Sequence, residues 1–156
     1  MDEAIAGPIH AFLASQGRDA RGRTLATVLD FDDARIESTH DFIQWLFPLR
    51  EASQAVPGSP VLGEAEAEAI RRDRMAQAGL MAARVRMMRF YVLTRGWLTA
   101  FDHNHLRITR ILTSLRDLVG LEEARAFLAD ILRLNEAAGS PVNPESLAYW
   151  RRAVED

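Results

Sequence analysis

The chain has 156 residues, of which 48% are hydrophobic and 26% charged, a composition typical of a folded protein with one core. It contains no cysteine, which excludes disulfides, thiolate metal ligands and cysteine nucleophiles and fits a cytoplasmic protein. The net charge is −3, but charge is unevenly distributed along the sequence. Residues 71–116 contain ten arginines and two aspartates, and the segments on either side are acidic.

Membrane segments and signal sequences are not expected. No apolar run approaches the length of a transmembrane helix, and the acidic start MDEAIAGPIH is unlike a signal peptide. All basic residues are arginine and alanine is abundant, which suggests a coding sequence rich in G and C and hence a bacterial source.

Helical periodicity dominates the chain from its start. Pro8 begins a short apolar helix that ends near Gly17. Residues 17–23, GRDARGR, are interpreted as a polar linker. Thr24 can cap a short helix, TLATVLDF.

A strongly apolar helix is predicted next, from an N-cap at Asp32 to Phe47, where Pro48 ends it. On a helical wheel, one arc collects apolar side chains and the narrow remaining arc is polar. The polar stripe consists of Glu37, His40, Asp41 and Gln44.

Residues 48–62 contain three prolines and a glycine, so they are predicted to form a long irregular connection. A helix then begins near Glu64 and either continues or restarts near Asp73, running to about Leu93. Its apolar stripe is predicted to be Met81, Val85, Met88 and Val92, packed in the core.

Three more helices follow. One opens at Asn104 and stops at Gly120, one covers 121–138, and one is capped by Asn143 with Pro144 in its first turn. The pattern predicts an all-α fold, a single compact, bundle-like domain of about six or seven helices.

Metal binding is one alternative open to the sequence. Glu37 and His40 form an E-x-x-H pair, but di-iron bundles need two such pairs and further glutamates. His103 and His105 could join His40 in a three-histidine site. The competing interpretation is that these histidines are hydrogen-bonded parts of the core, and no cofactor is predicted.

Catalytic motifs are absent from the sequence. No serine lies in a G-x-S-x-G elbow, and there is neither a Walker loop nor a G-x-G-x-x-G sequence. An acid–base group from Glu37, His40 and Asp41 is chemically possible, although structural pairing with arginines such as Arg107 and Arg110 is favoured. The sequence leaves an enzyme open but favours a non-enzymatic protein.

Nucleic-acid binding through the Arg-rich region 71–116 is the second alternative. Its arginines are spread around the predicted helices and not along one face. Pairing between the basic middle and the acidic flanks is therefore favoured, and nucleic acid is not the expected partner.

Two blocks carry a family resemblance. The run DDARIESTHDFIQWLFPLREAS (32–53) and the run HNHLRITRILTSL (103–115) resemble signatures of the opioid growth factor receptor family, in its conserved N-terminal domain. MMRFY (87–91) and LAYWRRAV (147–154) also fit. The resemblance assigns residues 24–154 to that conserved domain and leaves residues 1–23 as an N-terminal extension with a short helix. Together they are expected to form a single domain, residues 1–156. The protein would then be a bacterial member of the family that consists of this domain alone.

The resemblance implies a receptor that binds an enkephalin-type peptide; family members in animals are nuclear or membrane-associated. We therefore expect a non-enzymatic binding or interaction domain whose partner is a peptide, protein or small molecule, with no oligomeric state indicated. The ligand-binding side chains expected are Glu37, His40, Asp41, Gln44, Arg50, His103, His105, Arg107 and Arg110.

Overall fold

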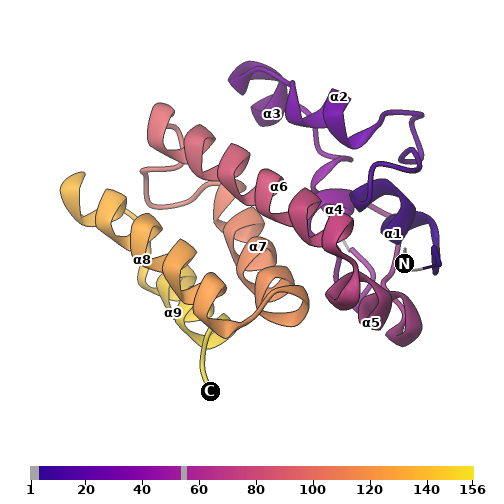
Figure 1. Cartoon of the computed structure of the whole chain (residues 1–156). Helices are drawn as coiled ribbons and strands as arrows, with labels where there is room; N and C mark the ends of the chain where they lie inside the picture. Colours follow the sequence, from indigo (N-terminus) through magenta and orange to yellow (C-terminus); the bar gives the residue numbers. More distant parts are fainter. Residues whose placement is uncertain (1–3, 54–55) are drawn as a thin grey trace. The chain divides into compact units, whose positions relative to one another are not determined.

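The computed structural model describes residues 4–53 and 56–156, and these residues form nine helices and no strand. The predicted all-α class is confirmed. The chain divides into an N-terminal unit, residues 1–83, and a C-terminal unit, residues 84–156, with the boundary inside the longest helix (Figure 1).

The N-terminal unit is built mainly from short helices. They are α1 (Pro8–Leu13), α2 (Leu25–Leu29), α3 (Asp33–Ser38), α4 (Ile43–Leu46), α5 (Glu64–Arg72) and the first half of α6 (Arg74–Leu93). Helix α1 packs against α4 and α5. Residues 1–3 of the predicted extension and 54–55 of the predicted connection lie outside the described residues.

Two of the predicted caps in this unit are confirmed. The Thr24 hydroxyl accepts a hydrogen bond from the Thr27 N–H at the start of α2, and the Asp32 carboxylate accepts one from the Arg35 N–H at the start of α3. Of the two alternatives left open at Asp73, continuation or restart, the structure shows the restart, because α5 ends at Arg72 and α6 begins at Arg74.

The predicted continuous helix from Asp32 to Phe47 is wrong. Thr39 is extended, with φ −104° and ψ 130°, so the segment splits into α3 and α4. The Asp41 carbonyl, which would accept the Trp45 N–H in a continuous helix, accepts instead from the Arg23 guanidinium, while the Trp45 N–H donates to Phe42. Long-range pairing therefore overrides the local helical pattern.

Gly79 of α6 lies where the helix backbone approaches α1. A Cβ at this position would lie 2.1 Å from the Leu13 carbonyl oxygen, a distance that no non-bonded carbon can occupy. The residue is glycine because any side chain would displace one of the two helices.

The C-terminal unit contains the second half of α6, then α7 (Asn104–Leu118), α8 (Leu121–Ala137) and α9 (Pro144–Ala153). Helix α7 packs against both α8 and α9. The α7–α8 junction is sharp because Gly120 adopts φ +149°, and the predicted N-cap Asn143 accepts a hydrogen bond from the Ser146 N–H at 2.8 Å.

The predicted buried stripe of α6 is wrong at two positions. Val85 and Val92 are exposed, whereas Met87, Phe90 and Tyr91 are fully buried. This helix is apolar around most of its circumference, so the spacing of its apolar residues does not single out the buried face.

Candidate functional site

The four residues of the predicted polar stripe do not share one helix. Glu37 lies in α3, His40 and Asp41 lie in the non-helical segment between α3 and α4, and Gln44 lies in α4. The break at Thr39 removes the helical spacing that placed them side by side. As a ligand-binding group the four stay a prediction, and the contacts of Asp41 and Gln44 point to structural roles.

Asp41 is held by two arginines from the segment predicted as a linker. Its Oδ2 accepts from Arg21 Nε at 2.9 Å, and its Oδ1 accepts from Arg23 Nη2 at 3.0 Å. Burial alone would raise the pKa of Asp41, but the hydrogen bonds and charges of Arg23 and Arg21 outweigh it and hold that pKa below its ordinary value.

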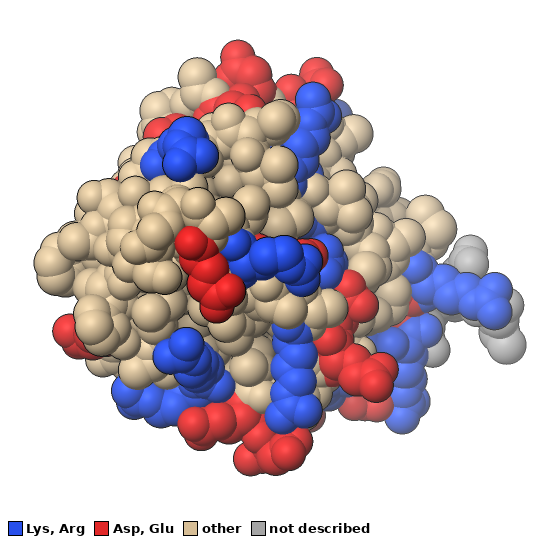
Figure 2. Space-filling model, turned by 90° about the vertical axis from the view of Figure 1, so that its left-hand side faces the viewer, with Lys and Arg blue, Asp and Glu red and all other residues tan. Residues whose placement is uncertain are grey.

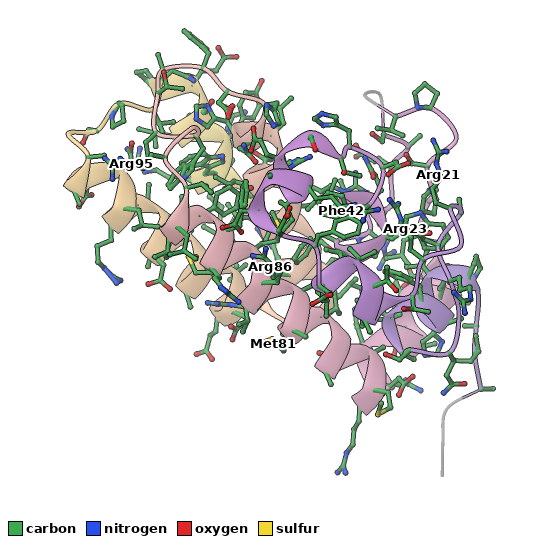
Figure 3. All side chains as sticks on the ribbon, turned by 90° about the horizontal axis from the view of Figure 1, so that it is seen from above. Arg21, Arg23, Phe42, Met81, Arg86 and Arg95 are labelled. Atoms are coloured by element: carbon green, nitrogen blue, oxygen red, sulfur yellow. The ribbon has the colours of Figure 1, made fainter. Side chains whose placement is uncertain are left out.

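The supposed linker, which carries Arg21 and Arg23 (Figure 3), is held by ion pairs. The buried Asp19 carboxylate accepts hydrogen bonds from the backbone N–H groups of Arg21 and Arg23 and from Arg23 Nε at 2.7 Å. Arg23 therefore bridges Asp19 and Asp41. The sequence signal was present as the i, i+4 pair Asp19–Arg23, which a polar-linker interpretation ignores.

Gln44 and Arg50 also serve local structure. The buried Gln44 side chain donates from Nε2 to the His40 carbonyl oxygen at 2.9 Å. Arg50 forms an ion pair with Glu64, which ties the start of the irregular connection to the first turn of α5.

A second ionic cluster surrounds His10, which sequence reasoning missed. His10 Nδ1 accepts the Ala6 N–H, so Nε2 carries the ring proton and donates to Asp73 Oδ2 at 2.7 Å. The His10 N–H in turn donates to the Glu66 carboxylate. Burial would raise the pKa of Asp73, but the hydrogen bonds from His10 and the Met75 N–H keep that pKa below its ordinary value.

In the C-terminal unit, His105 is a structural anchor. Its ring Nε2 donates to the Trp97 carbonyl oxygen at 2.8 Å, its own carbonyl accepts from Trp150 Nε1 at 2.9 Å, and the two rings pack edge to face. Trp97 Nε1 donates to the Tyr91 carbonyl oxygen. These bonds hold α7, α9 and the loop after α6 together.

His103 has a different environment, although it is two residues away. It is exposed, and its Nδ1 lies 3.3 Å from the Asp102 carboxylate. The proposed three-histidine metal site stays a prediction, since His40 belongs to the N-terminal unit and His103 and His105 to the C-terminal unit.

Arg107 and Arg110 lie on α7. Arg107 is buried, and partial burial of Arg110 lowers its pKa to about 10, which leaves the guanidinium charged at neutral pH. On the face in Figure 2, acidic and basic side chains are interspersed. Nucleic-acid binding through 71–116 stays a prediction.

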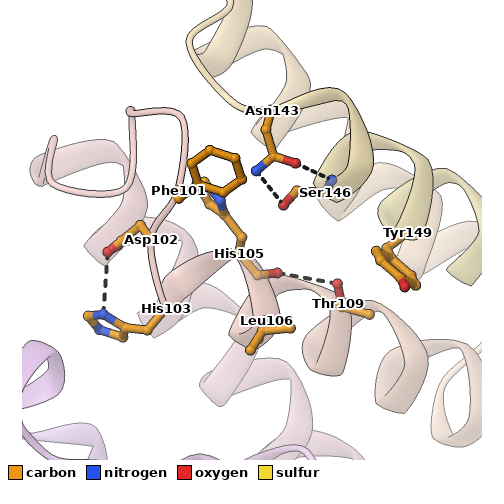
Figure 4. A pocket seen from close by; sticks show the side chains of 9 residues that line it. All are labelled: Phe101, Asp102, His103, His105, Leu106, Thr109, Asn143, Ser146 and Tyr149. Carbon is orange, nitrogen blue, oxygen red and sulfur yellow. Dashed lines mark hydrogen bonds and ion pairs between the residues drawn. The ribbon is translucent and has the colours of Figure 1, made fainter.

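An open pocket lies beside His105, wholly within the C-terminal unit, with a volume of about 460 Å³ (Figure 4). Such a volume falls in the range of small-ligand sites. The loop after α6, helix α7, and α9 with its N-cap contribute its lining, which is Phe101, Asp102, His103, His105, Leu106, Thr109, Asn143, Ser146 and Tyr149.

The pocket combines an apolar rim with polar groups. Phe101, Leu106 and Tyr149 are 77%, 73% and 45% exposed, unusually high values for large apolar side chains. His105 is only 4% exposed, and because its Nε2 is the donor to Trp97, Nδ1 of the neutral ring is an acceptor that bonds to no described residue.

The pocket shows no nucleophile–base pair among the described residues. Ser146 Oγ accepts from Asn143 Nδ2, and Thr109 Oγ donates to the His105 carbonyl oxygen. Asn143 Nδ2 also donates to the Ala100 carbonyl oxygen at 2.6 Å, which fixes the loop that carries Phe101.

Of the nine predicted ligand-binding residues, only His103 and His105 line this pocket. The sequence did contain a signal for two that were missed. Leu106 and Tyr149 are large apolar residues on the outer sides of helices whose buried positions are otherwise regular, and such residues indicate a binding surface.

The architecture and the pocket define an all-α protein with an open, apolar-rimmed site of ligand size. Residues 23–96 match the family described as the opioid growth factor receptor (OGFr) conserved region. The chain belongs to the opioid growth factor receptor family, as its sequence blocks indicated.

Curated relatives extend the similarity. The opioid growth factor receptor of Homo sapiens is 35% identical over 76% of this chain and 20% of its own length. That of Rattus norvegicus is 37% identical over 58% of this chain and 18% of its own. The opioid growth factor receptor-like protein 1 of Mus musculus is 32% identical over 80% of this chain and 31% of its own.

The chain thus spans between 18% and 31% of the length of these relatives. No solved structure is significantly similar to it. Within the described residues, no helix is both long enough and apolar enough to cross a membrane.

Proposed function

We propose that this chain is a non-enzymatic binding domain that takes a short peptide in the pocket of its C-terminal unit. The observation that carries the proposal is the exposed apolar rim of Phe101, Leu106 and Tyr149 around polar groups that do not form a catalytic pair. Relatives are called opioid growth factor receptors, and that name supports a peptide ligand of enkephalin type.

The polar lining suggests how a peptide would be oriented. The Asp102 carboxylate, which accepts from Asn104 Nδ2 at 3.2 Å and lies beside His103, can pair with a peptide ammonium group. The His105 Nδ1 acceptor can receive a peptide N–H. An aromatic peptide side chain would then lie against Phe101 and Tyr149, where aromatic contacts add to the burial of apolar area.

The test is a titration with an enkephalin-type pentapeptide, followed by anisotropy of a fluorophore placed at the peptide's C-terminus. We expect saturable binding that Phe101→Ala and Tyr149→Ala each weaken by about tenfold, the effect of losing one well-packed aromatic contact. Acetylation of the peptide N-terminus and Asp102→Asn should each weaken it similarly, because either change removes the charge pair.

Met75→Ala is the matched control, since Met75 is an exposed apolar residue in the N-terminal unit and its truncation should leave affinity unchanged. Absence of saturable binding would refute peptide recognition. Binding that survives both aromatic truncations would refute the site.

We also propose that the protein is cytoplasmic, as predicted from the sequence, and the absence of cysteine supports this location. Cell fractionation with an antibody to the chain would test it, and recovery in the membrane or secreted fraction would contradict it.

A further inference from the structure

The outer side of α6 in the C-terminal unit is apolar and exposed. Val85, Val92 and Leu93 are 62%, 55% and 60% exposed, although the opposite side of the same helix is fully buried. A single exposed valine would be ordinary, but here three large apolar residues lie exposed on one helix between positions 85 and 93.

Helical spacing places these residues together with one arginine. Positions 85 and 92 are seven residues apart and lie on nearly the same line along the helix, 93 lies beside 92, and 89 falls between them. We call Val85, Arg89, Val92 and Leu93 the α6 outer face.

The charge around this face has one sign. Residues 74–101 contain five arginines and no aspartate or glutamate. Arg84 already forms an ion pair within the unit, because its Nε lies 2.7 Å from the Glu123 carboxylate. Arg89 and Arg95 are exposed and form no ion pair with a described residue, so their charges are available to a partner.

We propose that the α6 outer face docks an acidic amphipathic helix of another protein. Aliphatic residues of that helix would cover Val85, Val92 and Leu93, and its carboxylates would pair with Arg89 and Arg95. Aliphatic side chains offer no stacking surface for nucleobases, and two turns without an interfacial aromatic are a weak membrane anchor, so a protein helix fits best.

The experiment uses a synthetic, fluorophore-labelled helical peptide with leucines along one face and glutamates beside them. Anisotropy measured against the whole chain should show saturable binding that Arg89→Glu and Val92→Asp each weaken by about tenfold or more. A second peptide with lysine in place of each glutamate should bind much more weakly, because like charges would then face Arg89 and Arg95.

Arg133→Glu on α8 is the matched control, since Arg133 is also exposed on a helix of this unit and should not affect binding. Equal binding of both peptides, or equal loss in the Arg133 variant, would overturn the proposal.

Two further measurements would show whether a different partner binds the α6 outer face. Concentration-dependent dimerisation in sedimentation that Val92→Asp abolishes would assign the face to a second copy of this chain. Stronger binding to phosphatidylserine vesicles than to the peptide, lost in Arg89→Glu, would assign it to a lipid surface. Either result would overturn the proposal, and neither would affect the peptide pocket.

Discussion

The N-terminal and C-terminal units are stabilised in different ways. In the N-terminal unit, α1 to α4 are only four to six residues long, and buried ionic groups around His10 and Asp19 hold them. In the C-terminal unit, α7 and α8 have 15 and 17 residues, and the tryptophans donate from their indoles to backbone carbonyls.

The difference follows from helix length. A helix of one or two turns cannot pay for its own nucleation and buries little apolar surface, so polar side chains must fix its position. A helix of four turns presents a full apolar face and needs fewer such contacts. Changes that remove one kind of contact should therefore affect mainly one unit.

The three tryptophans allow the units to be followed separately, because Trp45 lies in the N-terminal unit and Trp97 and Trp150 in the C-terminal unit. Their indole N–H signals in NMR spectra report the folding of each unit.

Gly79→Val should have the largest effect. The new Cβ would meet the Leu13 carbonyl oxygen, a backbone atom that can move only if α1 moves, and we expect a loss of about 5 kcal/mol in the free energy of unfolding. Urea titration should show the Trp45 signal lost first. The control is Gly63→Ala, since a Cβ there meets nothing, and a comparable loss in that variant would contradict the steric explanation.

Trp150→Ala should destabilise the C-terminal unit by about 3–5 kcal/mol, because it leaves a cavity beside His105. Trp150→Phe keeps most of the volume and loses the bond to the His105 carbonyl, so about 1–2 kcal/mol is expected. Thermal unfolding followed by the Trp97 and Trp45 signals would measure both. Equal losses in the two variants would show that the hydrogen bond, and not packing, dominates.

Acid should weaken the N-terminal unit through Asp41 and Asp73. Both carboxyls have a folded-state pKa below the ordinary value of 3.8, so each contributes stability that is fully present above pH 3.8 and is lost as pH falls through the lower folded value. Asp41→Asn and Asp73→Asn should each lower the free energy of unfolding by about 1–2 kcal/mol at neutral pH. Each should also reduce the loss of stability in acid, measured by the Trp45 signal; this pH dependence is called the acid limb. An unchanged acid limb in the double variant would contradict the assignment.

How far the sequence predicts the structure depends on whether local or distant groups decide each feature. The caps at Thr24, Asp32 and Asn143 depend on residues within one turn, and they were predicted correctly. The break after α3 depends on Arg23, 18 residues from Asp41, so the local pattern predicted a continuous helix there.

The candidate site was largely missed for a similar reason. Polar residues were singled out because of their chemistry, yet Asp41 bonds to Arg21 and Arg23, which are distant in sequence, and Gln44 bonds to the His40 carbonyl oxygen. The exposed rim residue Phe101 is of a common core type and lies in a loop, so its exposure depends on tertiary packing that no helical pattern displays.

The contact at Gly79 has a practical consequence for choosing the boundaries of an expressed fragment. The matched region begins at residue 23, beyond α1, although Gly79 inside that region is shaped to receive α1. A fragment trimmed to the matched region would expose the bare strip of backbone that α1 covers, together with the apolar side chains of α4 and α5 that face it. Retaining residues 4–22 should therefore decide whether such a fragment stays in solution.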